Sequence, residues 1–265
     1  MQQEDELERA LRLAAAEPAS RPDFFRTLLA SNIFVIGRDG DVTGTRTVQA
    51  GETLSIQNWT TQEGKPIIPF FTSIDALHRA GVTAGMYLSL SARAFFETTR
   101  GAQLVLNPRS PYGKEFFPNE IEALLATGTN ETPVSHVLRR ETQVLLGQPA
   151  NYPNALVASL KKFFATRDQV KAAYLALMHD ASRDAKPTLL IGIEIDGGDF
   201  ETLSREAGTV VGDYAMKSGE AVDVFRVERG KGGLSAHMVD AVAPFYARGF
   251  GASLRRLFGA GRNPR

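Results

Sequence analysis

Residues 107–121, NPRSPYGKEFFPNEI, hold the residue types that come nearest to a chemical motif in this chain. The Gly113-Lys114 pair lies between a strand-like LVL and a helix-like IEALL, where a phosphate-binding loop would place its glycine and lysine. Such a loop also needs glycine at the position of Pro108 and serine or threonine at that of Glu115. The pattern therefore argues against a nucleotide-binding loop of this kind.

Two other interpretations of the same stretch remain open. In the first, a polar surface precedes a helix N-terminus, which favours anions, and it consists of Tyr112, Gly113, Lys114 and Glu115. In the second, residues 110–113 form a turn, Pro118 is the first residue of a helix, and Glu120 occupies its third position. The first interpretation predicts ligand or partner binding, and the second a structural role.

Bulk composition limits the classes of function. The 265 residues carry 30 Lys plus Arg and 30 Asp plus Glu, so no net basic charge favours a nucleic-acid partner. The chain has no cysteine, which excludes disulfides, thiolate catalysis and cysteine-ligated zinc. Residues 1–18 lack the features of a secretory signal, and no apolar run approaches the roughly 20 residues of a membrane helix. We expect a cytoplasmic protein without a membrane span.

The first half of the chain mixes helix and strand patterns. Leu7, Leu11 and Ala14 fall on one face of a predicted N-terminal helix. Further helices are predicted over residues 22–30, 73–81, 92–101 and 118–126, and strands over 33–37, 52–60, 65–73, 85–91 and 102–108, with a surface loop over 38–52. These patterns predict a mixed α/β domain over residues 1–127, followed by a linker over 128–140.

The second half has a clearer order. A strand over 142–147 precedes a helix over 152–167 whose apolar stripe contains Leu156, Leu160, Phe163 and Phe164. Strands over 169–180 and 188–196, a helix over 199–214 and a strand over 220–228 follow. This β-α-β-β-α-β order predicts a ferredoxin-like domain over residues 141–250, with a basic tail over 251–265. The whole chain is therefore predicted to be an α+β protein of two domains.

The ferredoxin-like order predicts a second polar surface. In that architecture the first two strands are parallel and the third lies between them, so the turn after the first strand and the 179–187 hairpin turn share one end of the sheet. The candidate residues at that end are Asn151, Tyr152, His179, Asp180, Arg183, Asp184 and Lys186. Polar hairpin turns are also common without any function.

Other motifs are incomplete. Gly230, Gly232 and Gly233 follow a strand, but Ser235 stands where a dinucleotide-binding loop needs glycine or alanine. The four histidines lie far apart without metal-ligand spacing. The sequence therefore predicts no metal and no cofactor.

Three stretches resemble the SseB (enhanced serine sensitivity) family: IPFFTS, NPRSPYGKEFFPNEIEALL, and the segment from NYPNALVASL to TLLIGIEIDG. The resemblance covers nearly the whole chain and implies an amino-terminal and a carboxy-terminal SseB domain. It also implies a bacterial protein with an effect on serine tolerance and with no established catalytic residues. The family commonly has Thr-Pro-Glu-Glu where this chain has Phe117-Pro118-Asn119-Glu120. This departure removes a hydroxyl N-cap, at a cost of about 1 kcal/mol.

Three functional hypotheses follow. The first is a non-catalytic protein that binds a protein partner or a small metabolite through the two polar surfaces. The second is an enzyme acting on an amino acid or related metabolite, which requires Lys114 and Glu115 to converge on a closed pocket. The third is homo-oligomeric assembly through the N-terminal helix or the arginine-rich tail.

Overall fold

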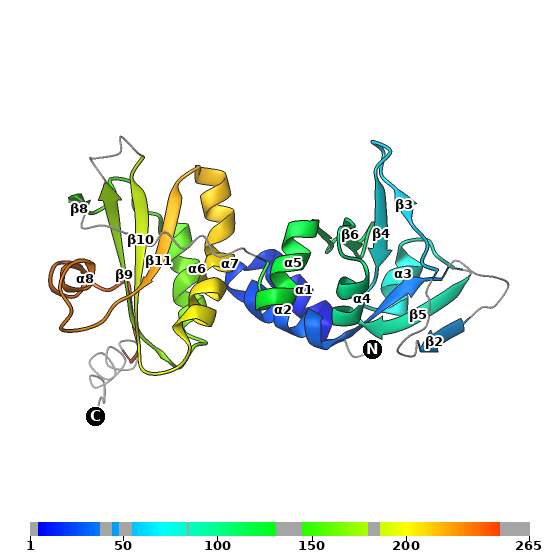
Figure 1. Cartoon of the computed structure of the whole chain (residues 1–265), viewed down its shortest axis with the longest axis horizontal. Coiled ribbons are helices and arrows are strands. Elements are labelled where there is room, and N and C mark those ends of the chain that lie inside the picture. The colour runs from blue at the N-terminus through cyan, green and yellow to red at the C-terminus, as the bar shows by residue number, and fades with distance from the viewer. Residues whose placement is uncertain are drawn as a thin grey trace, which may run out of the picture. The chain divides into compact units, whose positions relative to one another are not determined.

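The computed structural model describes residues 5–37, 44–47, 55–83, 85–130, 145–179 and 186–249. The chain divides into two compact units, residues 1–132 and 133–265, and each combines helices with β-sheet, as predicted (Figure 1). Most of the predicted linker and all of the predicted tail lie outside the described residues. The exact domain limits at residues 127 and 141 therefore stay predictions.

The N-terminal unit is built from short elements. Its described helices are α1 (Glu6–Ala16), α2 (Arg21–Ala30), α3 (Ile74–Arg79), α4 (Ala92–Thr98) and α5 (Pro118–Thr127), with a 3-10 turn at Pro18–Ser20. Its described strands are β1 (Asn32–Ile36), β2 (Gly44–Thr47), β3 (Trp59–Thr60), β4 (Pro66–Phe70), β5 (Met86–Ser91), β6 (Leu104–Leu106) and β7 (Lys114–Phe116).

The first helix forms as its sequence predicts. Asp5 caps α1, because its carboxylate accepts a hydrogen bond from the backbone N–H of Leu7. Leu7, Leu11 and Ala14 are buried, which confirms the predicted apolar face. The helix therefore packs this stripe on the core and leaves its polar side chains at the boundary of the domain.

Two sheets organise this unit. One has the order β3-β4-β6-β7, in which β4 and β6 are parallel, and the other has the order β1-β5-β2. A bridge between Phe34 and Phe71 joins them. The sheets and helices enclose an aromatic core whose fully buried rings include Phe25, Phe70 and Phe116.

Three expectations for this half need correction. The predicted loop over 38–52 contains β2, which pairs in parallel with β5. The predicted strand over 52–60 is reduced, among its described residues, to a bridge at Ile56 and the two residues of β3. Lys114–Phe116 form strand β7, which sequence reasoning missed because three residues are too few to show alternation.

The C-terminal unit contains longer elements. Its described helices are α6 (Asn154–Phe164), α7 (Phe200–Ser218) and α8 (Leu234–Ala241), and its described strands are β8 (Leu145–Gly147), β9 (Val170–His179), β10 (Thr188–Ile195), β11 (Ala221–Arg226) and β12 (Tyr246–Ala247). Leu156, Leu160, Phe163 and Phe164 are buried on α6, as predicted. Figure 1 shows α6 and α7 on one face of the β9-β10-β11 sheet and α8 on the other.

The predicted order of elements is present, but the predicted ferredoxin-like pairing is wrong. The sheet order is β11-β10-β9-β12, and β8 also pairs with β9. The first strand, β8, is antiparallel to β9 and adjacent to it, instead of parallel with β10 between them. β8 has only three described residues, and both Leu145 and Gly147 are exposed. The exposed side of these residues suits the outer edge of β9 better than an interior position that is covered on both faces, and β11 lies beside β10 instead.

No described helix is long and apolar enough to cross a membrane.

Candidate binding site

We call Gly113, Lys114 and Glu115 the GKE segment. The Lys114 side chain is held by contacts within the N-terminal domain. Its Nζ lies 2.9 Å from Glu120 Oε1, donates to the carbonyl of Glu115 at 3.1 Å, and sits 4.9 Å from the Phe116 ring centroid. Glu120 also accepts from the backbone N–H of Phe117 at 3.1 Å, and Pro118 begins α5. Half of the predicted capping arrangement thus persists without a hydroxyl N-cap.

Glu115 lies on the other face of β7. It is exposed, and its Oε2 is 3.4 Å from Gln103 Nε2 at the start of β6. Because successive strand residues point to opposite faces, Lys114 and Glu115 diverge. They do not converge on a closed pocket, which is the arrangement that the enzyme hypothesis required.

A polar cluster that sequence reasoning missed lies at the ends of β4 and β6. Thr72 follows β4 and is fully buried, and Asn107 follows β6 and is 3% exposed. The Thr72 backbone N–H donates to Asn107 Oδ1 at 3.0 Å, and Asn107 Nδ2 donates to Thr72 Oγ1 at 2.9 Å. Buried polar groups are stable only when paired, so this reciprocal pair locks the two strand ends together.

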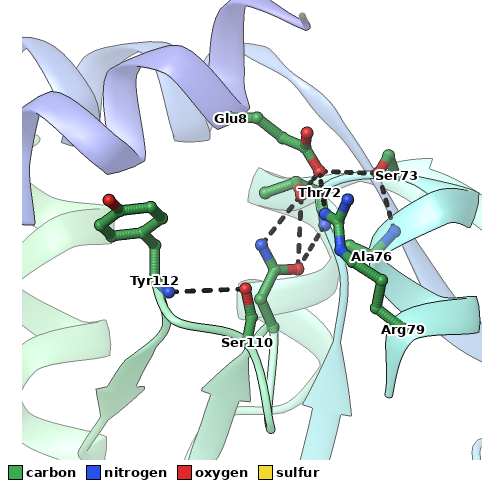
Figure 2. Close-up of polar contacts among 8 residues, drawn as sticks. Glu8, Thr72, Ser73, Ala76, Arg79, Ser110 and Tyr112 are labelled. Atoms are coloured by element: carbon green, nitrogen blue, oxygen red, sulfur yellow. Dashed lines mark hydrogen bonds and ion pairs between the residues drawn. The ribbon is translucent and has the colours of Figure 1, made fainter. Parts of the chain in front are cut away.

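Glu8 completes this cluster from helix α1. Its Oε1 accepts from Thr72 Oγ1 at 2.9 Å, from Ser73 Oγ at 2.8 Å and from Arg79 Nη2 at 3.1 Å (Figure 2). Ser73 also caps α3 by accepting from the backbone N–H of Ala76. The Glu8 side chain is 22% exposed, whereas that of Arg79 is 54% exposed. We call Glu8, Thr72, Ser73, Arg79 and Asn107 the strand-end cluster.

The loop after β6 has an unusual backbone. Asn107 and Arg109 have φ values of 47° and 64°, a region that residues other than glycine enter rarely. The Arg109 guanidinium donates to the Ala80 carbonyl at 3.0 Å and lies 5.2 Å from the Trp59 ring centroid. Gly113 passes so close to β6 that an added Cβ would be 2.8 Å from the Leu106 carbonyl oxygen. These contacts hold the loop beside the strand-end cluster.

Tyr112 is an exposed aromatic residue of this loop, with 43% of its surface accessible. In Figure 2 a dashed line joins its backbone nitrogen to the Ser110 hydroxyl. Phe117, at the other end of β7, is 48% exposed. Two exposed aromatic residues therefore flank the GKE segment.

The second predicted surface, at residues 151–152 and 179–186, was based on the ferredoxin-like pairing, which the structure contradicts. Leu145 pairs with His179 and Gly147 with Leu177, so the chain leaves β8 in the direction away from the 179–187 hairpin. Asn151, Tyr152 and Lys186 are exposed, and His179 is half-buried at the end of β9. The other three candidates, Asp180, Arg183 and Asp184, lie outside the described residues. The binding role of these residues stays a prediction.

The C-terminal sheet contains a buried carboxylate that was not a candidate. Glu194 of β10 is 7% exposed, accepts from Arg229 Nε at 2.8 Å, and is 3.4 Å from the Tyr174 hydroxyl. The Arg229 hydrogen bond lowers the pKa of Glu194, although burial opposes that shift. Burial and the nearby Glu194 charge raise the pKa of Tyr174. The Glu194 carboxylate therefore has its hydrogen-bond partners, Arg229 and Tyr174, within the C-terminal domain.

The strand-end cluster is the best candidate site because it combines three chemical features. It offers the partly exposed Glu8 carboxylate, the exposed Arg79 guanidinium and the half-buried Ser73 hydroxyl beside the carboxyl ends of two parallel strands, where α/β sheets commonly bind ligands. No group of three or more His, Cys, Asp or Glu residues in the described part of the chain could hold a metal ion. The cluster therefore suits polar recognition by hydrogen bonds and charge.

Sequence reasoning missed the cluster because its members are distant in sequence. Glu8, Thr72 and Asn107 belong to three segments that only the fold brings together. A usable signal existed, since Thr72-Ser73 and Asn107 directly follow apolar strands. It becomes informative only once those strands are known to be parallel neighbours.

Comparisons with known proteins agree with this two-domain architecture. The SseB protein N-terminal domain matches residues 7–123, and the SseB protein C-terminal domain matches residues 138–248. Protein SseB of Escherichia coli (strain K12) is 37% identical over 251 residues, which is 95% of each chain, and Protein SseB of Shigella flexneri has the same identity and coverage. No solved structure shows significant similarity.

The chain is therefore a two-domain α+β protein of a bacterial family. It belongs to the SseB family.

Proposed function

We propose that this SseB-family member is a non-catalytic, cytoplasmic binding protein whose N-terminal domain holds a small polar metabolite at the strand-end cluster. One observation carries the proposal. Among the described residues, Glu8 accepts three side-chain hydrogen bonds, all at Oε1 and none at Oε2. The second carboxylate oxygen of this partly exposed side chain thus stands near the exposed guanidinium of Arg79.

These two charges suit a ligand that carries both an ammonium and a carboxylate group. The carboxylate oxygen attracts an ammonium group, and a guanidinium binds a carboxylate through charge-assisted hydrogen bonds. Thr72 and Asn107 contribute by fixing the position of Glu8, since a site binds more tightly when its groups are held in place before binding. A free amino acid has this chemistry, which is compatible with the serine tolerance implied by the family resemblance.

A thermal-shift screen of the full chain with serine and other small amino acids tests this proposal. A ligand present at about 100 times its Kd stabilises the folded protein by about 2.7 kcal/mol. We expect such a shift for the wild type and its loss in Glu8→Gln, which keeps the shape of the side chain and removes the charge. Glu115→Gln is the matched control, because Glu115 is exposed on strand β7. Equal shifts in both variants, or no shift with any amino acid, would overturn the proposal.

The link to serine tolerance has a separate test in cells. A bacterial strain that lacks its own SseB protein would be supplied with the wild-type chain or with Glu8→Gln. We expect the wild type to restore growth in excess serine and Glu8→Gln to fail at equal protein abundance. Restoration by both would remove the strand-end cluster from this phenotype.

A protein partner is the second candidate, and it is favoured by the exposed Tyr112 and Phe117. Exposed aromatic residues are enriched at the centres of protein interfaces. Pull-down with the wild type, Tyr112→Ala and the double variant Lys114→Ala, Glu115→Ala tests this surface. If both variants retain every partner of the wild type, residues 112–115 are not a binding surface.

A further inference from the structure

The C-terminal sheet ends on one side at β11, which pairs with β10 in parallel. The backbone N–H of Val227 donates to the Ile193 carbonyl at 2.9 Å, so this residue directs its backbone groups toward β10. Backbone groups alternate in direction along a strand. Those of Val222, Val224 and Arg226 therefore point outward, away from β10, and they make no backbone hydrogen bond to another described residue.

This open edge differs from the sheet edges formed by β7, β3 and β9. β7 has three residues, and Lys114 Nζ already occupies its Glu115 carbonyl. β3 has two residues, and the outer edge of β9 is paired with β8 at one end and β12 at the other. β11 has six residues, without proline, glycine or lysine, the residues that commonly interrupt or blunt an edge.

The side chains of β11 are also only partly covered. Val222, Val224 and Phe225 are half-buried, although they belong to a sheet with helices on both faces. An edge strand with open backbone groups can pair with another strand. The edge of β11, whose charged residues are Asp223 and Arg226, therefore suits an occupant that supplies a strand.

We propose that the occupant is β11 of a second copy of this chain, paired antiparallel about a twofold axis at Val224. In this register Val224 pairs with Val224 of the partner subunit, and Val222 pairs with Arg226 of the partner subunit. All three outward-facing residues then lie in hydrogen-bonded pairs, so all six outward N–H and C=O groups are satisfied. The two sheets become one continuous sheet.

Neighbouring registers fit less well. A twofold axis at Asp223 would set Arg226 opposite Glu220 of the partner subunit, but it places two Asp223 side chains directly opposite each other, and like charges opposite each other are destabilising. A twofold axis at Phe225 leaves the outward groups of Val222 unpaired. The register at Val224 is therefore the one that the backbone and the charges select.

Charge complementarity supports the same register. Arg226 and Glu220 are exposed, and their even spacing puts them on the same face of the strand. When Arg226 lies opposite Val222 of the partner subunit, Glu220 of the partner subunit is its diagonal neighbour. Diagonal neighbours are about 7–8 Å apart, which is within reach of a long side chain. The symmetry forms this opposite-charge pair twice.

Sedimentation of the full chain across a wide concentration range is the first test, and we expect a monomer–dimer equilibrium. Val224→Pro removes the central donor from both copies but no bond inside one copy, because the Val224 N–H points outward. We expect its dimer Kd to rise at least about tenfold. A monomer at every concentration, or a dimer that Val224→Pro does not weaken, would overturn the proposal.

Single cysteines test the register independently of any folding defect in the proline variant. The chain has no cysteine of its own, so each variant carries one thiol. Two Val224→Cys residues would face each other with Cα atoms about 5.5 Å apart, which a disulfide can span. Ala221→Cys is the matched control, since Ala221 is exposed on the same strand but far from the axis. We expect Val224→Cys to cross-link much faster, and equal rates would overturn the register.

A charge reversal gives a third readout. Arg226→Glu would face Glu220 of the partner subunit and should weaken the dimer, whereas the double variant Glu220→Arg, Arg226→Glu should restore it. The interface lies in the C-terminal domain. If the dimer proposal fails these tests, the proposed ligand site of the N-terminal domain is therefore not affected. A dimer that the single reversal leaves unchanged would contradict the diagonal pair.

Discussion

Two neighbouring regions of the N-terminal domain use polar residues in opposite ways. The strand-end cluster assembles from Glu8, Thr72 and Asn107, and its central residues are buried. The GKE segment is continuous in sequence, and its side chains divide between a half-buried ion pair at Lys114 and solvent at Glu115. The GKE segment, which is visible as a motif in the sequence, thus forms an edge strand. The strand-end cluster, which no sequence motif marks, is the better candidate site.

The difference follows from where each polar group lies in the sheet. β7 is an edge strand, and the face that carries Glu115 is open to water, so a charge there needs no partner. β4 and β6 are parallel neighbours in the sheet interior, so polar groups at their ends must pair with each other. We expect substitutions in the cluster to cost more stability than substitutions in the GKE segment.

The largest effect is expected at Asn107. Asn107→Ala leaves the buried Thr72 N–H without its acceptor and forces alanine to adopt a positive φ. We expect a loss of about 2–4 kcal/mol in the free energy of unfolding, measured by urea denaturation. Asn107→Gly separates the two causes, and it should cost about 1 kcal/mol less because glycine adopts positive φ freely. A loss similar to that of an exposed substitution would show that the cluster is not a structural centre.

Gly113→Ala comes next and tests the part of the GKE segment that touches the cluster. An added Cβ would lie 2.8 Å from the Leu106 carbonyl oxygen and 3.0 Å from that of Asn107, so backbone must move. Overpacking of this kind costs about 1–3 kcal/mol. Gly147→Ala is the control, since its added Cβ meets nothing within 4 Å. Similar unfolding midpoints for the two variants would contradict this account of Gly113.

Lys114→Ala and Glu115→Ala form a matched pair with smaller effects. Lys114→Ala removes the ion pair with Glu120 and the contact with the Phe116 ring, so it should lower the free energy of unfolding by about 1 kcal/mol. Glu115 is exposed, so its removal should change the free energy of unfolding by less than about 0.5 kcal/mol. Urea denaturation of both variants checks the order. A larger loss at Glu115 would mean that the solvent-facing side of β7 is structurally important.

The pH dependence of stability extends the comparison to Glu194 in the C-terminal domain. Its folded-state pKa is lowered, chiefly by the hydrogen bond from Arg229. The lowered pKa adds to the free energy of unfolding. This added stability is present above the unfolded pKa of about 4.3 and is lost as pH falls through the lower folded pKa. Arg229→Ala should raise the folded pKa, so its stability should fall less steeply with decreasing pH below about pH 5. Parallel stability curves for the two proteins would show that Arg229 does not control this carboxylate.

Much of the local structure was predictable from particular residues. The apolar spacing of Leu7, Leu11 and Ala14 predicts the buried face of α1, and that of α6 is predicted in the same way. Such patterns succeed because burial on one face imposes the period of the element on its sequence. Strand β7 (Lys114–Phe116) was not predicted, because three residues are too few to show the alternation of a strand.

The candidate site was less predictable. Tyr112, Lys114 and Glu115 were visible as a motif, whereas Glu8 and Asn107 looked like an ordinary helix residue and an ordinary strand end. Their roles depend on the parallel pairing of β4 with β6 and on the packing of α1 beside them. No local pattern contains that information.

The sequence alone is enough to predict the helices and most strands, the family, the absence of thiol chemistry and the order of elements from β8 to β11. The packed domains are needed to show that β8 lies beside β9, that Lys114 and Glu115 diverge, and that Glu8 meets Thr72. Periodicity records which side of an element is buried. Which elements become neighbours depends on competition among strands of different length and apolar content, and that competition is settled only when the whole domain packs.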